Sequence, residues 1–171
     1  YNQALAELDQ AIALNPREAL AYQYRGAIYL QQGHLDEATK NTEAALFLSP
    51  TSAAHYQSGQ IAQAQGDIHL AMQHYETAIE KATPFFFTRY ATEVAGRPPL
   101  AEERLPCLVI PRFEDDLVLP TLAMATLLES AGDDAQAVEV YRHGLLVLPD
   151  EPRLKAHLDR LCGEQPASCQ E

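Results

Sequence analysis

The sequence has 171 residues, with 12 Lys and Arg against 24 Asp and Glu, which gives a formal charge of −12 at pH 7. A nucleic-acid partner requires a basic surface that neutralises phosphates, so this balance argues against one. The sequence holds no run of about 18 apolar residues, and we therefore expect no membrane span within it.

Residues 17–50 contain two stretches with the spacing of amphipathic helices. In each stretch, small or aromatic residues recur at i, i+4 and i+7, which places them on one helix face. These residues are Tyr22, Gly26 and Tyr29, then Ala38, Thr42 and Ala45. Gly33 separates the two stretches as a turn residue, and Pro50 ends the second. Residues 1–16 carry only the second-helix pattern, so we expect a truncated repeat and a chain that is a fragment of a longer polypeptide.

Residues 51–84 repeat this hairpin pattern, and its landmarks recur every 33 or 34 residues: Pro16, Pro50 and Pro84, and the glycines Gly33 and Gly66. A period of this length is typical of stacked helical hairpins, in which each unit buries its apolar face against the next. Asp67 directly follows the turn glycine and is placed to cap the second helix.

The pattern weakens in residues 85–116. They lie within the segment 84–120, which holds six of the eleven prolines. We expect a helix at 86–96, a short helical turn at 100–105 and an extended segment at 107–110. Because Gly132 follows Gly66 by two repeat lengths, we interpret 85–116 as a degenerate repeat whose second helix is largely replaced by an extended loop. A plain insertion between repeats is the alternative. The apolar residues of the 98–116 loop either complete the core, which we favour, or cover the neighbouring groove.

Helical spacing returns in residues 117–149, where we expect a helix at 118–131, a turn at Gly132 and a second helix at 135–147. Residues 150–162 predict a capping helix that shields the last repeat, and 163–171 a flexible tail. Cys162 and Cys169 could form a local disulfide in an oxidising compartment, but nothing in the sequence requires it. The compartment itself stays undetermined.

The shared phase of these residues resembles the tetratricopeptide repeat family. The matching residues are Tyr22, Gly26, Tyr29, Gly33, Ala38, Ala45 and Pro50, then Gly59, Ala62, Gly66, Ala71, Tyr75, Ala78 and Pro84, and later Ala137, Tyr141 and Pro149. The resemblance covers most of residues 1–84 and 117–149. It implies an all-α fold, a right-handed α-solenoid of helix-turn-helix repeats with one degenerate, proline-rich repeat and a C-terminal capping helix.

The sequence contains no glycine-rich phosphate loop and no G-x-S-x-G motif. His69 and His74 are five residues apart, which puts them on different helix faces, unlike an i, i+4 metal pair. We interpret the acidic run 114–116 as the start of the helix that follows, because acidic side chains favour a helix N-terminus. We therefore expect no catalytic residue, no metal and no cofactor.

The resemblance implies that the first helix of each repeat lines a concave face that holds an extended peptide or another protein chain. Helical spacing assigns ten residues to this face: Gln23, Tyr24, Ala27, Gln31, Tyr56, Gln57, Gln60, Gln63, Thr126 and Glu129. Most are amides and tyrosines, which can bond a peptide backbone and offer contact area. Some members of the family clamp a terminal carboxylate with Lys and Asn on this face, where this sequence has Gln and Ala.

We predict a non-catalytic scaffold that binds a protein or peptide. One alternative is a substrate-recruiting or regulatory part of a larger enzyme or membrane protein, whose active domain lies outside this sequence. Self-association through exposed repeat ends is a further alternative. A solvated helix face without a ligand explains the same ten residues equally well.

Overall fold

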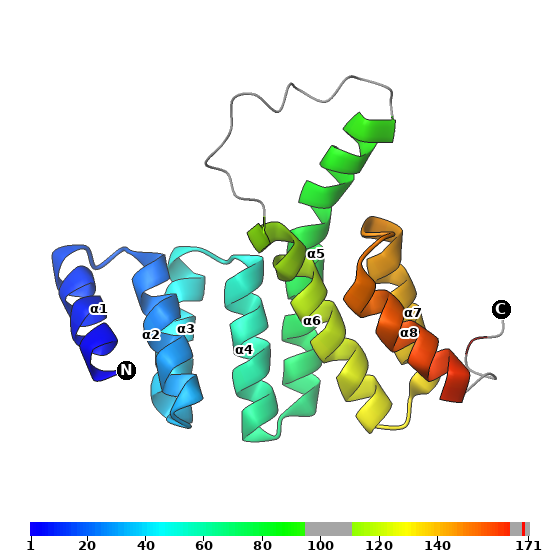
Figure 1. The fold of residues 1–171 in the computed structure, drawn as a ribbon. Helices are drawn as coiled ribbons and strands as arrows, with labels where there is room; N and C mark the ends of the chain where they lie inside the picture. Colours follow the sequence, from blue (N-terminus) through cyan, green and yellow to red (C-terminus); the bar gives the residue numbers. More distant parts are fainter. Residues whose placement is uncertain (95–110, 165–168, 170–171) are drawn as a thin grey trace. The chain divides into compact units, whose positions relative to one another are not determined.

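The computed structural model of the chain describes residues 1–94, 111–164 and 169, with residues 83–94 and 111–114 described in their backbone only. The described residues form eight helices (Figure 1): α1 Asn2–Leu14, α2 Ala19–Gln31, α3 Leu35–Leu48, α4 Ser52–Gln65, α5 Ile68–Val94, α6 Pro111–Ser130, α7 Asp134–Val147 and α8 Pro152–Glu164. The chain divides into two compact units, residues 1–78 and 79–171, and α5 crosses the division. Within the described part of the chain, no helix has both the length and the apolar character needed to cross a membrane.

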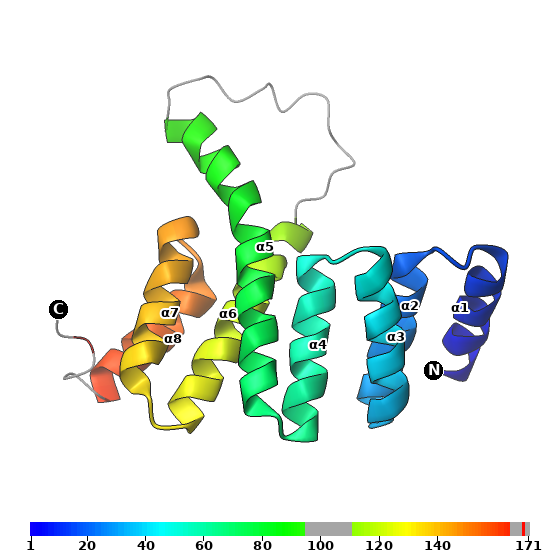
Figure 2. The same cartoon turned by 180° about the vertical axis from the view of Figure 1, so that it is seen from behind.

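Unit 1 is a row of antiparallel helices in which α1, α2, α3 and α4 lie side by side, as both views show (Figures 1 and 2). Each packs against its neighbour in the sequence, and α2 also contacts α4. The predicted small faces are buried, with Ala38, Thr42 and Ala45 on α3 and Ala71, Tyr75 and Ala78 on α5. A core of alanines lets helices approach closely, and this order of contacts is that of an all-α solenoid.

The three turn glycines have the backbone geometry that the sequence predicts. Gly33, Gly66 and Gly132 have φ angles of 77°, 83° and 79°, in the left-handed region that side chains other than glycine rarely adopt. Asp67 caps α5 as expected, because its Oδ1 accepts a hydrogen bond from the Leu70 backbone N–H at 3.0 Å. The glycines therefore form the turns between the helices of the hairpins, and Asp67 caps the start of α5.

Unit 2 contains α6, α7, α8 and the later part of α5. Helix α7 contacts both α6 and α8, and α6 contacts α8. Most buried side chains of unit 2 are larger than the alanines that predominate in the core of unit 1. They include Leu117, Val118, Val138, Tyr141 and Leu154. A helix, α8, is present where the sequence predicts a capping helix, and its buried side chains are Leu154 and Leu161. The last helix of unit 2 is therefore amphipathic, with one buried apolar face.

The C-terminal residues depart from the flexible tail that the sequence predicts. Gly163 and Glu164 belong to α8, and Cys162 forms a disulfide with Cys169. The Cys169 carbonyl also accepts a hydrogen bond from Arg142 Nη2 at 3.0 Å. The local disulfide that the sequence leaves open is therefore present, and it ties residue 169 back to the last hairpin.

Two predicted boundaries are wrong. We expected Pro84 to end a helix and a separate helix to follow at 86–96, but α5 is continuous from Ile68 to Val94. We also expected a helix at 118–131 after an extended loop, whereas α6 begins at Pro111 and contains both the acidic run and Pro120. Proline favours the first turn of a helix, and in the interior it removes one N–H donor while keeping a helical φ.

These boundaries also change the interpretation of residues 85–116. Their described parts are helical, 85–94 in α5 and 111–116 in α6, so the extended loop does not reach residue 116. The short turn at 100–105 and the extended segment at 107–110 lie outside the described residues.

His55 of α4 and His74 of α5 form a close pair, with ring centroids 5.7 Å apart and their Nδ1 atoms 3.4 Å apart. Burial lowers the pKa of His74 below its ordinary value of 6.5. The folded state therefore disfavours a proton on this ring.

We expect unit 1 to lose stability as the pH falls below 6.5, because the unfolded chain then binds a proton that folded His74 resists. The loss is complete once the pH is below the lowered pKa of the folded state. Urea unfolding at pH 7.5 and 5.5 measures it, with His74→Gln expected to reduce the difference and the exposed His69→Gln expected to keep it. An equal pH dependence in the wild type and His74→Gln would contradict this origin.

Candidate functional site

One face of α2 carries a stripe of accessible side chains. Leu20, Tyr24, Ala27 and Gln31 follow one another at i, i+4, i+7 and i+11, which keeps them on one side of the helix. Leu20 is 49% exposed and Tyr24 is 44% exposed, so a large apolar and an aromatic side chain face solvent one turn apart. We did not assign Leu20 from the sequence, although the same helical spacing extended one turn backwards would have included it.

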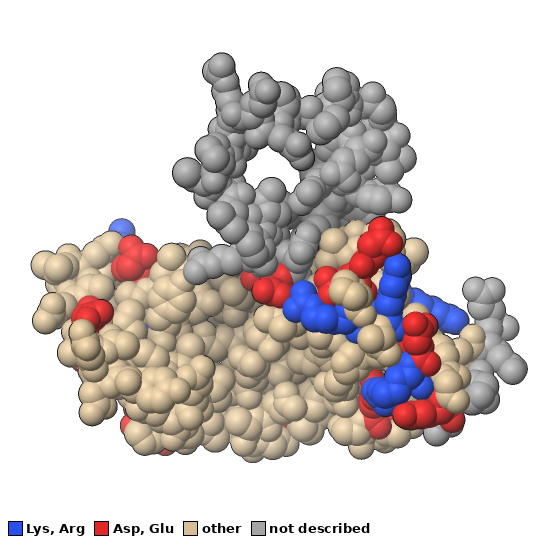
Figure 3. All heavy atoms as spheres, viewed as in Figure 1, with Lys and Arg blue, Asp and Glu red and all other residues tan. Residues whose placement is uncertain are grey.

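The surface formed by α2 and α4 is nearly uncharged. Helix α4 contains no Asp, Glu, Lys or Arg, and α2 contains only Arg25. The Arg25 guanidinium is engaged by Asp9 Oδ1 at 2.5 Å and by Asn41 Oδ1 at 2.7 Å. Figure 3 shows this face almost free of charged atoms over α2 and α4, whereas acidic and basic side chains gather over α8. The part of unit 1 formed by α2 and α4 is therefore nearly uncharged.

The α4 side chains Tyr56, Gln60 and Gln63 are held by hydrogen bonds. Gln60 Nε2 donates to the Tyr56 hydroxyl at 3.1 Å, and Tyr75 donates to Gln63 Oε1 at 2.7 Å. Burial raises the pKa values of Tyr56 and Tyr75 above the ordinary value of 10.0, so both hydroxyls resist ionisation. These bonds fix the side chains, so a ligand would meet a surface that is already ordered.

Gln57 and Gln23 connect the two helices rather than extend the surface. Gln57 is only 5% exposed, and its Nε2 donates to the Gln23 backbone carbonyl at 3.1 Å. At the outer edge, the Tyr1 hydroxyl donates to Gln31 Oε1 at 2.9 Å. Eight of the ten predicted residues thus lie on α2 and α4, two helices of unit 1 that contact each other through the buried Gln57. They are Gln23, Tyr24, Ala27 and Gln31 on α2 and Tyr56, Gln57, Gln60 and Gln63 on α4.

The two remaining predicted residues, Thr126 and Glu129, lie in unit 2. The Thr126 hydroxyl donates to the Leu122 carbonyl of its own helix at 2.8 Å. Glu129 accepts from the Tyr141 hydroxyl at 2.6 Å and from Arg160 of α8. Burial opposes ionisation of Glu129, but the bonds from Tyr141 and Arg160 outweigh it and lower its pKa. Glu129 thus joins the helices of unit 2, and we restrict the candidate surface to unit 1.

Within the described part of the chain, no group of three or more His, Cys, Asp or Glu side chains is arranged to hold a metal ion. The chemistry that the α2–α4 surface offers is contact area, amide hydrogen bonds and tyrosine hydroxyls. Such groups can bind a polypeptide, because a side-chain amide can donate to a backbone carbonyl and accept from a backbone N–H.

Comparison with known proteins identifies the repeat. Two models of the family described as "Tetratricopeptide repeat" match residues 7–40 and residues 52–80. The chain is also 31% identical over 80 residues to the Hsp70-Hsp90 organizing protein of Triticum aestivum, a match that covers 47% of this chain and 13% of that relative. The two family matches lie almost entirely within unit 1, whose period, turn glycines and buried alanines agree with them. The chain contains tetratricopeptide repeats within residues 7–40 and 52–80.

Proposed function

We propose that this chain is a non-catalytic scaffold that binds an extended segment of a protein partner on the α2–α4 surface of unit 1. The observation that carries the proposal is the stripe of Leu20, Tyr24, Ala27 and Gln31 beside a helix without charges. Exposed leucine and tyrosine provide apolar contact, and the neighbouring amides of α4 supply hydrogen bonds to a peptide backbone.

The neutral surface argues for recognition of an internal segment rather than a chain end. Clamping a terminal carboxylate with charge-assisted hydrogen bonds needs a cation, and the lone cation of α2 and α4, Arg25, is already bonded to Asp9 and Asn41. The name of the wheat relative assigns it to the organisation of Hsp70 and Hsp90. For this chain we propose protein binding in general, and the proposal does not extend to Hsp70 or Hsp90.

A peptide array with matched free and amidated C-termini tests the proposal. We expect sequences with apolar and aromatic residues to bind equally well in both forms, because the surface has no group for a terminal carboxylate. Binding that requires a free C-terminus would contradict the proposed mode. A complete lack of peptide binding across the array would contradict the scaffold itself.

A further inference from the structure

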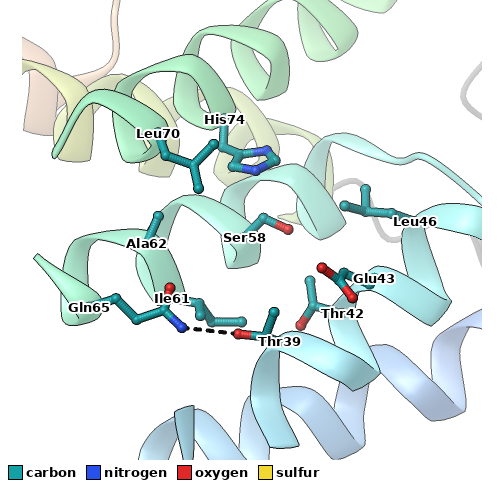
Figure 4. Close-up of a pocket in the computed structure, with 10 residues that line it drawn as sticks. All are labelled: Thr39, Thr42, Glu43, Leu46, Ser58, Ile61, Ala62, Gln65, Leu70 and His74. Atoms are coloured by element: carbon teal, nitrogen blue, oxygen red, sulfur yellow. Dashed lines mark hydrogen bonds between the residues drawn. The ribbon is translucent and has the colours of Figure 1, made fainter. Parts of the chain in front are cut away.

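Unit 1 contains a pocket on α3, α4 and the first turns of α5, with a volume of about 180 Å³ (Figure 4). Its apolar lining consists of Leu46, Ile61, Ala62 and Leu70, and Thr39, Thr42, Glu43, Ser58, Gln65 and His74 complete it. A hydrogen bond from Gln65 Nε2 to Thr39 Oγ1, 3.2 Å long, joins α4 to α3 at one side. The pocket is therefore bounded by three helices with an apolar lining and a few polar groups.

This pocket is separate from the proposed peptide surface. On α4 it uses Ser58, Ile61 and Gln65, which lie on the opposite side of the helix from Tyr56, Gln60 and Gln63. No residue of α2 lines it. A ligand in the pocket would therefore leave the α2–α4 surface free.

The size of the pocket fits one side chain. Clefts that hold whole small molecules measure roughly 300–1,000 Å³, whereas an apolar cavity of roughly 150 Å³ accepts a molecule the size of benzene. The volume of about 180 Å³ is close to the second case. An aliphatic or aromatic side chain of a partner is the occupant that this volume favours.

The rim of the pocket adds a preference for positive charge. Glu43 is exposed and, among the described residues, has no ion-pair partner. Phe47 follows it by one turn of α3 and is 89% exposed. A carboxylate and an aromatic face on the same side of a helix both attract a guanidinium or ammonium group.

The charge of unit 1 points the same way. Residues 1–78 contain three basic and eight acidic side chains, a formal charge of −5. Of the three cations, Lys40 lies one turn before Glu43, while Arg17 and Arg25 belong to the α2 end of the unit. We propose that this pocket binds an apolar side chain of a partner peptide whose next residue is arginine or lysine, with Glu43 and Phe47 holding the cation.

Two-dimensional NMR of the chain, titrated with short blocked peptides, tests the inference. Acetyl-Gly-Leu-Arg-Gly-amide is expected to shift the signals of Leu46, Ile61 and Leu70. Replacing its arginine by glutamate or its leucine by alanine is expected to weaken binding. Glu43→Lys is expected to reduce affinity for the arginine peptide about fivefold, since exposed charge pairs are modest, and Phe47→Ala to reduce it by a similar factor.

Matched controls separate the site from general charge and apolar effects. Glu76→Lys makes the same charge change on another side of α5, and Leu14→Ala removes a side chain that is 88% exposed elsewhere in unit 1. Both are expected to bind like the wild type, whereas Ser58→Leu fills the pocket and is expected to abolish binding. The inference is overturned if the arginine and glutamate peptides bind alike, if the shifts fall on α2, or if dilution alone moves the pocket signals, which would indicate a second copy as occupant.

Discussion

Gly59→Ala is expected to lower the free energy of unfolding by about 1–3 kcal/mol, the usual effect of overpacking a close-packed core. A Cβ atom at this position would overlap with Cε1 and Cδ1 of the Tyr75 ring. Tyr75 is fully buried and bonded to Gln63, so its ring cannot move aside freely. Helix propensity alone predicts the opposite sign, a gain of about 1 kcal/mol for alanine over glycine. Thermal unfolding of both proteins decides between the two effects.

A second substitution checks the cause. Thr42 stands 33 residues before Tyr75, opposite Gly26, so the chain itself uses threonine at the corresponding position of the earlier repeat. In a Tyr75→Thr background the ring is gone, and Gly59→Ala is expected to destabilise less, although a threonine still approaches the new methyl group, as Thr42 Oγ1 would lie 2.8 Å from a Cβ atom on Gly26. If Gly59→Ala destabilises both backgrounds equally, contact with Tyr75 is not the reason.

Tyr24→Ala is expected to weaken binding of an array-selected peptide by about 2 kcal/mol, a loss of roughly 30-fold in affinity. Tyr24 offers an exposed aromatic side chain at the centre of the stripe, with Leu20 one turn before it and Ala27 after it. Tyrosine in such a position contributes large contact area at a small loss of conformational freedom. Titration calorimetry with the wild type and the variant measures the change.

Phe47→Ala is the matched control for Tyr24→Ala, because Phe47 is also an exposed aromatic residue of unit 1 but lies on α3. It is expected to leave affinity for this peptide unchanged. Equal losses in both variants would place the peptide elsewhere. An unchanged affinity in Tyr24→Ala would remove α2 from the binding surface.

The periodic part of the fold could be predicted from the sequence because each feature has a local physical cause. Ala38, Thr42 and Ala45 share a face by helical spacing alone, and that face is buried. Gly33 and Gly66 mark turns because other residues rarely adopt their φ angles. The neutral character of the α2–α4 surface follows from the absence of charged residues in α4, which can be read directly in the sequence.

The prolines and the buried amide could not be assigned in this way. A proline favours the end of a helix, yet one lies inside α5 and another inside α6, and the sequence does not show where a helix continues through a proline. Gln57 lies one residue after Tyr56 and was assigned to the surface, yet the approach of α2 turns its amide to the Gln23 carbonyl. Such a contact depends on the distance between two helices, which no local pattern contains.

Backbone amide NMR of the chain with an array-selected peptide tests the central claim most directly, because it locates the bound segment on individual residues. We expect the largest shifts at Tyr24, Ala27 and Gln60, with Leu70 and the residues of unit 2 unchanged. Shifts confined to unit 2, or to α3 and the start of α5, would contradict a binding surface on α2 and α4.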